Sequence, residues 1–239
     1  MLPIRDINPR HRAAPVTWTL LALIIAGYLT QVFIAAQRDE TLLALMYAAA
    51  FIPETFWAEP FAHAFSLVTH AFLHADPFHL IGNAFFLVVF GDNVEARLGS
   101  RRFLAFYLTA AAAAALTHGA IDPQGWRPMI GASGAISAVL GAYVLWFPRR
   151  KVQAFIAPLF LPWIFARMLG RIPRFYLWWL PAWLYIGYWA LIQFLEAGGS
   201  LAPGATADAG VAWWAHVGGF VFGLVLAPLI DPRRRSSRS

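Results

Sequence analysis

Four polar side chains lie in otherwise apolar stretches of this sequence, and their types suit joint chemistry: His79, Asn83, Ser133 and His216. Ser133 stands between Gly131 and Gly134 in the stretch Gly-Ala-Ser-Gly. A serine hydroxyl attacks a carbonyl carbon only if a base removes its proton, and histidine, which titrates near neutral pH, suits that role. We therefore predict nucleophilic catalysis with Ser133 as nucleophile and His216 as general base. The ordinary alternative for a serine in such a stretch is helix packing.

His79 and Asn83 are four residues apart, which places them on one face of a helix. An imidazole and an amide there could donate hydrogen bonds to the negative oxygen that forms when a nucleophile adds to a carbonyl group. The backbone N–H of Ser133, at the start of a helix, would be a further donor. We expect these three groups to bind the oxyanion.

The composition indicates which elements must position these side chains. Of the 239 residues, 60% are hydrophobic and 13% are charged, with a mean hydropathy of +0.60, whereas a soluble domain is about one quarter charged. Crossing a bilayer takes roughly 20 apolar residues, and short spans of about 17 occur. Six segments approach or meet this requirement: 16–36, 78–94, 102–119, 132–147, 176–196 and 211–230. The sequence therefore predicts an all-α polytopic membrane protein, a bundle of six transmembrane helices.

Basic residues are distributed unevenly over the connections between these segments. In a six-span arrangement, 16 of the 18 lysine and arginine residues fall on one side, and Arg38 and Arg127 fall on the other. By the positive-inside rule, both termini are expected in the cytoplasm. The net charge of +6 then reflects topology and contact with lipid head groups, without nucleic acid as a partner. The expected organisation is a cytoplasmic segment 1–15, a six-helix membrane domain 16–230 with a membrane-associated first loop 37–77, and a basic cytoplasmic tail 231–239.

Two connections have unusual compositions. Loop 37–77 is long and apolar, which predicts short helices that lie in the outer interface and pack against the bundle. Segment 155–166 contains Pro158 and Pro162, which together with its brevity argue against a seventh span.

The predicted topology brings the four polar side chains together. The second, fourth and sixth segments all run from the outside to the inside, so their first residues share one depth near the outer surface. A set of polar groups that converges inside a membrane is a functional hypothesis by default, because burying such groups in lipid is costly. Gly219 and Gly223 should let the sixth segment lie closely against the small-residue face of the fourth, which carries Gly134, Ala138 and Gly141.

At these residues the chain resembles the rhomboid-type intramembrane serine proteases, over nearly all of its length from about Leu67 to the end of the sixth segment. Four stretches carry the resemblance: Gly-Ala-Ser-Gly at 131–134 is similar to the nucleophile motif, His79-x-x-x-Asn83 to the oxyanion-side motif, Ala-His-Val-Gly-Gly at 215–219 to the general-base motif, and 91–100 to the G-x-x-x-E-x-R-x-G turn. One departure is the pair Phe65-Ser66 ahead of Thr69-His70, where the family often carries Trp-Arg.

The resemblance implies a Ser133–His216 dyad, with Asn83, His79 and the Ser133 N–H at the oxyanion. It also implies a membrane-embedded first loop, and a fifth helix and a following loop that gate the substrate. The implied substrates are membrane proteins in the lipid bilayer, cut near the outer leaflet without a cofactor. The abundance of arginine over lysine and of alanine hints at a bacterial plasma membrane. The sequence predicts no oligomeric state.

Several other interpretations are possible. His70, His74 and His79 suggest a metal site, but the first pair lacks the glutamate of the H-E-x-x-H helix and the chain has no cysteine. We therefore expect no metal, and interpret His70 and His74 as partners of loop backbone groups. Glu95 and Arg97 are expected to form a cytoplasmic turn network with local backbone.

The alternative function is that of a catalytically inactive relative that binds or escorts membrane clients, but such a protein would be expected to lack Ser133 or His216. A transporter usually shows acidic residues at mid-membrane, and none lies mid-span here.

Overall fold

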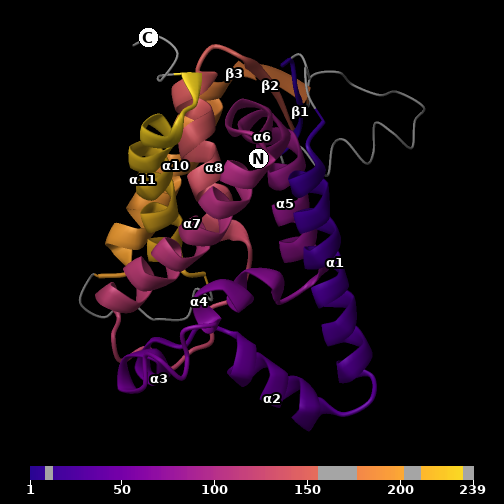
Figure 1. Ribbon diagram of the computed structural model, residues 1–239, viewed down its shortest axis with the longest axis vertical. Helices are drawn as coiled ribbons and strands as arrows, with labels where there is room; N and C mark the ends of the chain where they lie inside the picture. Colours follow the sequence, from indigo (N-terminus) through magenta and orange to yellow (C-terminus); the bar gives the residue numbers. More distant parts are fainter. Residues whose placement is uncertain (9–12, 156–176, 202–210, 234–239) are drawn as a thin grey trace.

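Long helices make up most of the computed structural model, which describes residues 1–8, 13–155, 177–201 and 211–233 (Figure 1). The bounds of the long helical segments are α1 Pro15–Ala35, α5 Pro77–Phe86 continued by the π-helical turn η2 Leu87–Gly91 and by α6 Asp92–Leu98, α7 Ser100–Ile121, α8 Ser133–Trp146, α10 Ala182–Gly199 and α11 Trp213–Ile230. Local sequence explains several of the ends. Pro15 and Pro77 occupy the first turns of α1 and α5, where the missing N–H is not needed. The Asp76 carboxylate accepts hydrogen bonds from the first free N–H groups of α5.

Four helices in the described part of the chain are long and apolar enough to cross a membrane: Pro15–Ala35, Pro77–Leu98, Ser100–Ile121 and Trp213–Ile230. This confirms a mostly helical protein with several helices able to span a membrane. The full number of six spans stays a prediction, in part because α8 is apolar but only 14 residues long. The orientation of the termini also stays a prediction.

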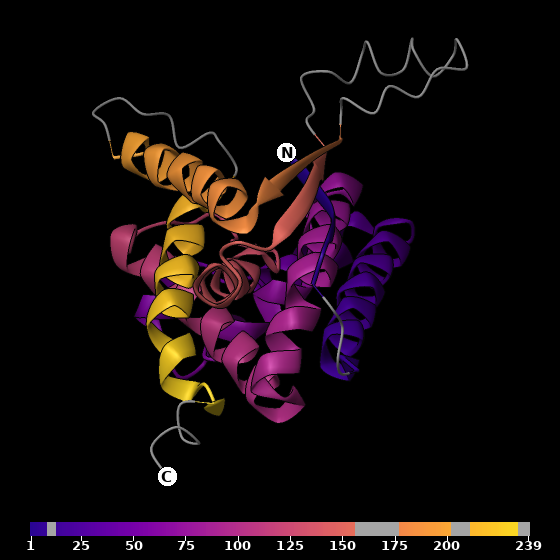
Figure 2. The ribbon, with the colours of Figure 1, turned by 90° about the horizontal axis from the view of Figure 1, so that it is seen from above.

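Helix α8 lies at the centre of the bundle, with the other long helices around it (Figure 2). Every residue of α8 from Gly134 to Tyr143 is buried. Helices α7 and α11 pack against it directly. A helix covered by protein on all sides need not match the thickness of the bilayer, because its ends can lie below the membrane surface.

A small antiparallel sheet was not expected from the sequence. Strands β1 (Leu2–Asp6), β2 (Lys151–Phe155) and β3 (Leu177–Pro181) pair in the order β1-β2-β3, with Leu2 opposite Phe155 and Lys151 opposite Pro181. The predicted start of the fifth span at residue 176 is therefore wrong, because α10 begins at Ala182. Hydropathy alone cannot distinguish an apolar strand such as Leu-Trp-Trp-Leu from the first turn of a helix. The prediction for segment 155–166 falls almost entirely outside the described residues.

The first loop forms short helices, as predicted: α2 (Asp39–Ala49), α3 (Pro53–Ala58), α4 (Ser66–Thr69) and the 3-10 turn η1 (His70–Phe72). They gather at the end of the bundle opposite the sheet (Figure 1). Trp57 Nε1 donates to the Gly119 carbonyl at 2.9 Å, Thr69 Oγ1 donates to the Ala49 carbonyl at 2.6 Å, and Phe51 and Met129 exchange two backbone hydrogen bonds. The bonds of Trp57 and Phe51 attach the loop to the end of α7 and to the segment before α8, and the bond of Thr69 joins two parts of the loop itself.

At the end of the bundle near the sheet, two charged side chains, Glu95 and Arg97, form hydrogen bonds with helices that are distant in sequence. The buried Glu95 carboxylate accepts hydrogen bonds from the N–H groups of Val16 and Thr17 and from the hydroxyls of Thr17 and Ser100, at 2.7–3.0 Å. A carboxylate at the start of a helix satisfies free N–H groups and complements the helix dipole. The expected network with local backbone is therefore wrong, because Glu95 mainly caps α1.

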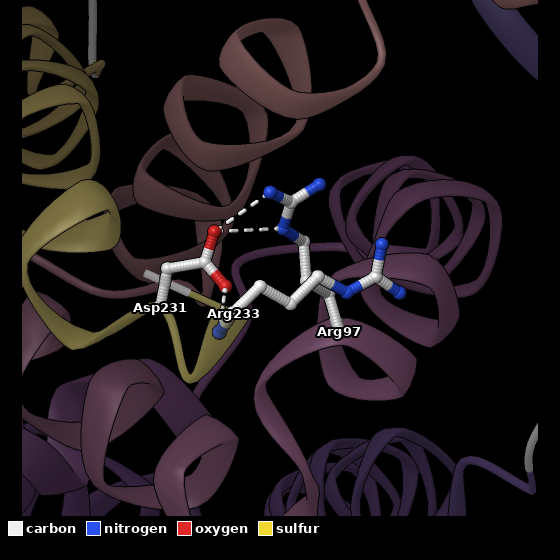
Figure 3. A network of polar contacts seen from close by, with 3 residues as sticks. All are labelled: Arg97, Asp231 and Arg233. Carbon is white, nitrogen blue, oxygen red and sulfur yellow. Dashed lines mark hydrogen bonds and ion pairs between the residues drawn. The ribbon is translucent and has the colours of Figure 1, made fainter. Parts of the chain in front are cut away.

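Arg97 makes the second of these contacts (Figure 3). Its Nη2 and Nε lie 2.6 and 3.1 Å from Asp231 Oδ2, just beyond the end of α11, and its guanidinium lies 4.7 Å from the ring centre of Trp146. Burial alone would raise the pKa of Asp231, but the hydrogen bonds from Arg97 and from the backbone of Arg233 hold this pKa below its usual range. The Asp231 carboxylate therefore stays charged, and its ion pair with Arg97 links α6 to α11 while the guanidinium packs on α8.

Replacing Glu95 with Gln should lower the free energy of unfolding by about 1–3 kcal/mol, because the amide has one acceptor oxygen and leaves a buried N–H of α1 without a partner. The measurement is the unfolding midpoint in detergent. The matched control is Glu59→Gln at an exposed position of the first loop, which should leave the midpoint unchanged. Equal midpoints for both variants would show that Glu95 does not hold α1.

Candidate active site

Ser133 and His216 meet although 83 residues separate them. Ser133 is the first residue of α8, and His216 lies in the first turn of α11. The Ser133 Oγ lies 2.7 Å from the His216 Nε2, and both side chains are half-buried. The predicted nucleophile and base are therefore within hydrogen-bonding distance of each other.

The short distance depends on a close contact between the two helices. A Cβ atom on Gly219 would overlap the carbonyl oxygen of Gly134, and one on Gly223 would overlap that of Ala138. A Cβ atom on Gly141 would lie 2.5 Å from the carbonyl oxygen of Phe220. The predicted contact between the small residues of α8 and the glycine pair of α11 is confirmed.

The other ring nitrogen of His216 also has a partner. His216 Nδ1 lies 2.6 Å from Oε1 of Gln193, which is buried on α10. A neutral imidazole donates from one nitrogen and accepts at the other. Because an amide oxygen can only accept, the contact with Gln193 is a hydrogen bond when the ring proton is on Nδ1, and Nε2 is then the acceptor for the hydroxyl of Ser133.

Sequence reasoning missed Gln193, although one signal was available. It is a polar side chain in the apolar run Leu191-Ile192-Gln193-Phe194-Leu195. Uncharged polar groups in a membrane helix also need partners, because no water is at hand there.

His79 and Asn83 lie beside the loop that leads into α8. Gly131 has a φ of +116°, and a Cβ atom there would lie 2.7 Å from both Cε1 and Nε2 of the His79 ring and 3.7 Å from Asn83 Nδ2. Glycine is the residue that adopts this φ without strain. The glycine therefore lets His79 approach the backbone two residues before Ser133, and Asn83 lies beside the same backbone.

His74 belongs to this group as well, which sequence reasoning missed. Its Nε2 lies 2.9 Å from Nδ2 of the buried Asn83, and its ring packs edge-on against His79 with centroids 5.0 Å apart. Burial lowers the pKa of His74 to about 4, so the ring is neutral at pH 7 and accepts from Asn83. An amide nitrogen has two N–H donors, so one remains for another acceptor. Sequence reasoning expected loop backbone as the partner of the His74 ring, and a backbone hydrogen bond to Phe72 agrees with this; the contact with Asn83 of α5 was not expected.

The backbone of His74 is tied to α1: its N–H donates to Gln31 Oε1 at 2.9 Å, and its carbonyl accepts from Gln31 Nε2 at 3.1 Å. His74 and Asn83 are nine residues apart. This spacing brings the two side chains together only because the loop folds back on α5.

His70 behaves as predicted. Its Nδ1 lies 2.9 Å from the Ser66 carbonyl, and its own carbonyl accepts from the Gly131 N–H at 2.9 Å. Burial lowers the pKa of His70 to about 4. The neutral ring therefore bonds within the first loop, and the backbone carbonyl of His70 ties this loop to the one before Ser133.

This arrangement is suited to acyl transfer, because a hydroxyl is hydrogen-bonded to a base and N–H donors lie nearby. In the described part of the chain, no group of three or more His, Cys, Asp or Glu side chains is arranged to hold a metal ion.

Comparison with known proteins identifies a family-model match, described as a rhomboid domain, over residues 62–233. The chain is 34% identical over 98 residues to rhomboid protein 1, mitochondrial, of Saccharomyces cerevisiae, a match that covers 39% of this chain and 28% of that protein. It is 29% identical over 133 residues to the rhomboid protease GlpG of Klebsiella pneumoniae (55% of this chain, 44% of that protein). It is 30% identical over 122 residues to rhomboid-like protease 3 of Toxoplasma gondii (51% and 43%). These matches span less than half the length of each relative.

Two glycine-to-alanine changes should have opposite effects on stability. Gly219→Ala forces α11 away from α8, and overpacking of this kind costs about 1–3 kcal/mol. Gly187→Ala on α10 meets no atom within 4 Å, and replacing an exposed helical glycine should stabilise the helix by about 0.5–1 kcal/mol.

The unfolding midpoints of both variants in detergent provide the measurement. If Gly219→Ala unfolded at the same midpoint as Gly187→Ala, the close contact between α8 and α11 would be wrong.

Proposed function

The chain belongs to the rhomboid family, and from this premise we propose that it is an intramembrane serine endopeptidase that cleaves transmembrane segments of membrane proteins near the outer leaflet. The observation that carries the proposal is the 2.7 Å hydrogen bond between Ser133 Oγ and His216 Nε2. Several matched relatives are named as proteases, which supports the same reaction class.

In the first half of the reaction, Ser133 Oγ attacks the carbonyl carbon of the scissile peptide bond while His216 Nε2 takes its proton. The tetrahedral intermediate collapses, the C–N bond breaks, and the imidazolium returns the proton to the leaving amine. In the second half, His216 takes a proton from a water molecule whose oxygen attacks the acyl carbon. The ester bond to Ser133 then breaks and Oγ regains a proton.

The oxyanion that forms in both halves needs donors already in place. We assign this role to the free N–H of the Asn83 amide, to His79 and to the Ser133 backbone N–H at the start of α8. His74 would support the site by holding Asn83 in a fixed rotamer. Donors that are held in position before the reaction stabilise the transition state without a cost of reorganisation.

The proposed topology follows from the charges. We propose six spans with both termini in the cytoplasm: segment 1–15, membrane domain 16–230 and tail 231–239. Loop 37–77 would then lie in the outer leaflet beside the site. GlpG is bacterial, and the proposed address is a bacterial plasma membrane.

The decisive experiment for the function is labelling of the purified protein in detergent by a fluorophosphonate, which bonds covalently to an activated serine oxygen. Wild type and Ser137→Ala should be labelled, whereas Ser133→Ala and His216→Ala should not. Ser137 is a suitable control because it lies one turn later on the same helix.

Cleavage of a model transmembrane substrate should follow the same pattern. If wild type neither reacted with the probe nor cut the substrate, the alternative of an inactive family member that binds or escorts membrane clients would replace this proposal.

Asn83→Ala should reduce the turnover of a transmembrane substrate by about 10²–10³, the usual effect of losing one oxyanion donor. Labelling of Ser133 should remain detectable in this variant, because the Ser133–His216 hydrogen bond is intact. Turnover at the wild-type rate would remove Asn83 from the oxyanion site.

A further inference from the structure

Gln193 is a buried amide on a helix whose other face is apolar and exposed. It is 6% exposed, whereas its neighbours Leu191, Phe194 and Leu195 are 44–60% exposed. The buried face of α10 is otherwise formed mainly by apolar side chains, including Ile186 and Ala190. Burying an amide in an apolar environment is costly unless it forms hydrogen bonds. Its bond to His216 therefore explains why an amide is tolerated at this position.

The bond selects one of the two neutral forms of His216. In the orientation that places the amide oxygen of Gln193 against the ring, a proton on Nε2 would leave Nδ1 and this oxygen as two acceptors facing each other at 2.6 Å, and Nε2 could not accept from Ser133. With the proton on Nδ1, both hydrogen bonds form at once. Gln193 thus favours the tautomer that a general base requires.

The same bond also suits the charged form of His216. When Nε2 takes the serine proton, the imidazolium donates from both nitrogens, and the amide oxygen remains in place as the acceptor for Nδ1. A carboxylate would be a stronger acceptor, but an ionised carboxylate within a membrane bundle carries a large desolvation cost. An amide supplies the acceptor without a second buried charge.

A second side chain of α10 contacts the same ring. Trp189 lies one helical turn before Gln193, on the same face of α10, and its ring centroid is 6.2 Å from that of His216. Trp213 contacts the ring edge-on at 5.9 Å. Gln193 therefore adds a hydrogen bond to an imidazole that two tryptophan rings already contact.

From these contacts we propose that Gln193 is a positioning residue that completes a hydrogen-bonded chain Ser133–His216–Gln193 and holds His216 in its base-competent tautomer. This inference rests on the proposed serine-protease function and assigns a third member to its dyad.

The test compares Gln193→Met, which keeps the length of the side chain but removes a strong acceptor, with Gln193→Glu, which keeps an acceptor. The matched control is Gln153→Met on β2, a glutamine of similar burial whose Oε1 accepts from Arg5 Nε at 3.0 Å. The first measurement is the rate constant for fluorophosphonate labelling of the full chain in detergent.

Gln193→Met should react about tenfold more slowly, the effect of losing one hydrogen bond of ordinary strength. Gln193→Glu should recover most of the rate, and Gln153→Met should match wild type. Wild-type labelling together with an unchanged rate in Gln193→Met would overturn the inference while the proposed function stands.

The second measurement is NMR of protein with ¹⁵N-labelled histidine, with the His216 signals assigned by their loss in His216→Ala. In wild type, the His216 proton should reside on Nδ1 and resonate far downfield, and Gln193→Met should shift it upfield. A merely structural role for Gln193 would not change this signal.

The NMR measurement also tests the inference if Gln193→Met fails to fold or if wild type does not react with the probe. A wild-type spectrum with the proton on Nε2 would overturn the inference in either case.

Discussion

The contact between α8 and α11 is the constraint on which the rest of the site depends. Within lipid, the hydrophobic effect does not drive two apolar helices together, so their association depends on close packing. Gly219 against Gly134, and Gly223 against Ala138, remove the side chains that would separate the two backbones. Ser133 and His216 lie at the same end of these two helices. The 2.7 Å hydrogen bond between them is therefore a consequence of backbone proximity.

Different forces hold the two ends of the bundle. At the end near the sheet, the charged groups Glu95, Arg97 and Asp231 bind helix ends to one another, and these bonds involve full charges at the boundary of the bundle. At the other end, neutral groups hold the site: the His70 carbonyl binds the Gly131 N–H, and Gln31 binds the backbone of His74. Neutral groups suit the oxyanion site that we propose, because they do not add a permanent charge to be desolvated.

Residues with a local or periodic signal could be predicted from the sequence. The apolar segments, the short helices of the first loop and the glycine contact between α8 and α11 all follow from hydropathy and spacing. The pair Ser133 and His216 followed from placing three segment starts at one depth. The sheet could not be predicted, because β1 pairs with a strand about 150 residues away, and such pairing leaves no local pattern. The ion pair between Arg97 and Asp231 is similarly distant in sequence. The contacts of His74 with Asn83 and of Gln193 with His216 join nearer residues, but they form only once the loop and the helices have packed together.

An experimental structure of the protein after reaction with a fluorophosphonate tests the central claim most directly. We expect a phosphorus–oxygen bond at Ser133, the ring of His216 still beside that oxygen, and the phosphoryl oxygen directed toward Asn83, His79 and the Ser133 N–H. An adduct on another residue, or a phosphoryl oxygen directed away from these donors, would contradict the account of how this bundle builds its site.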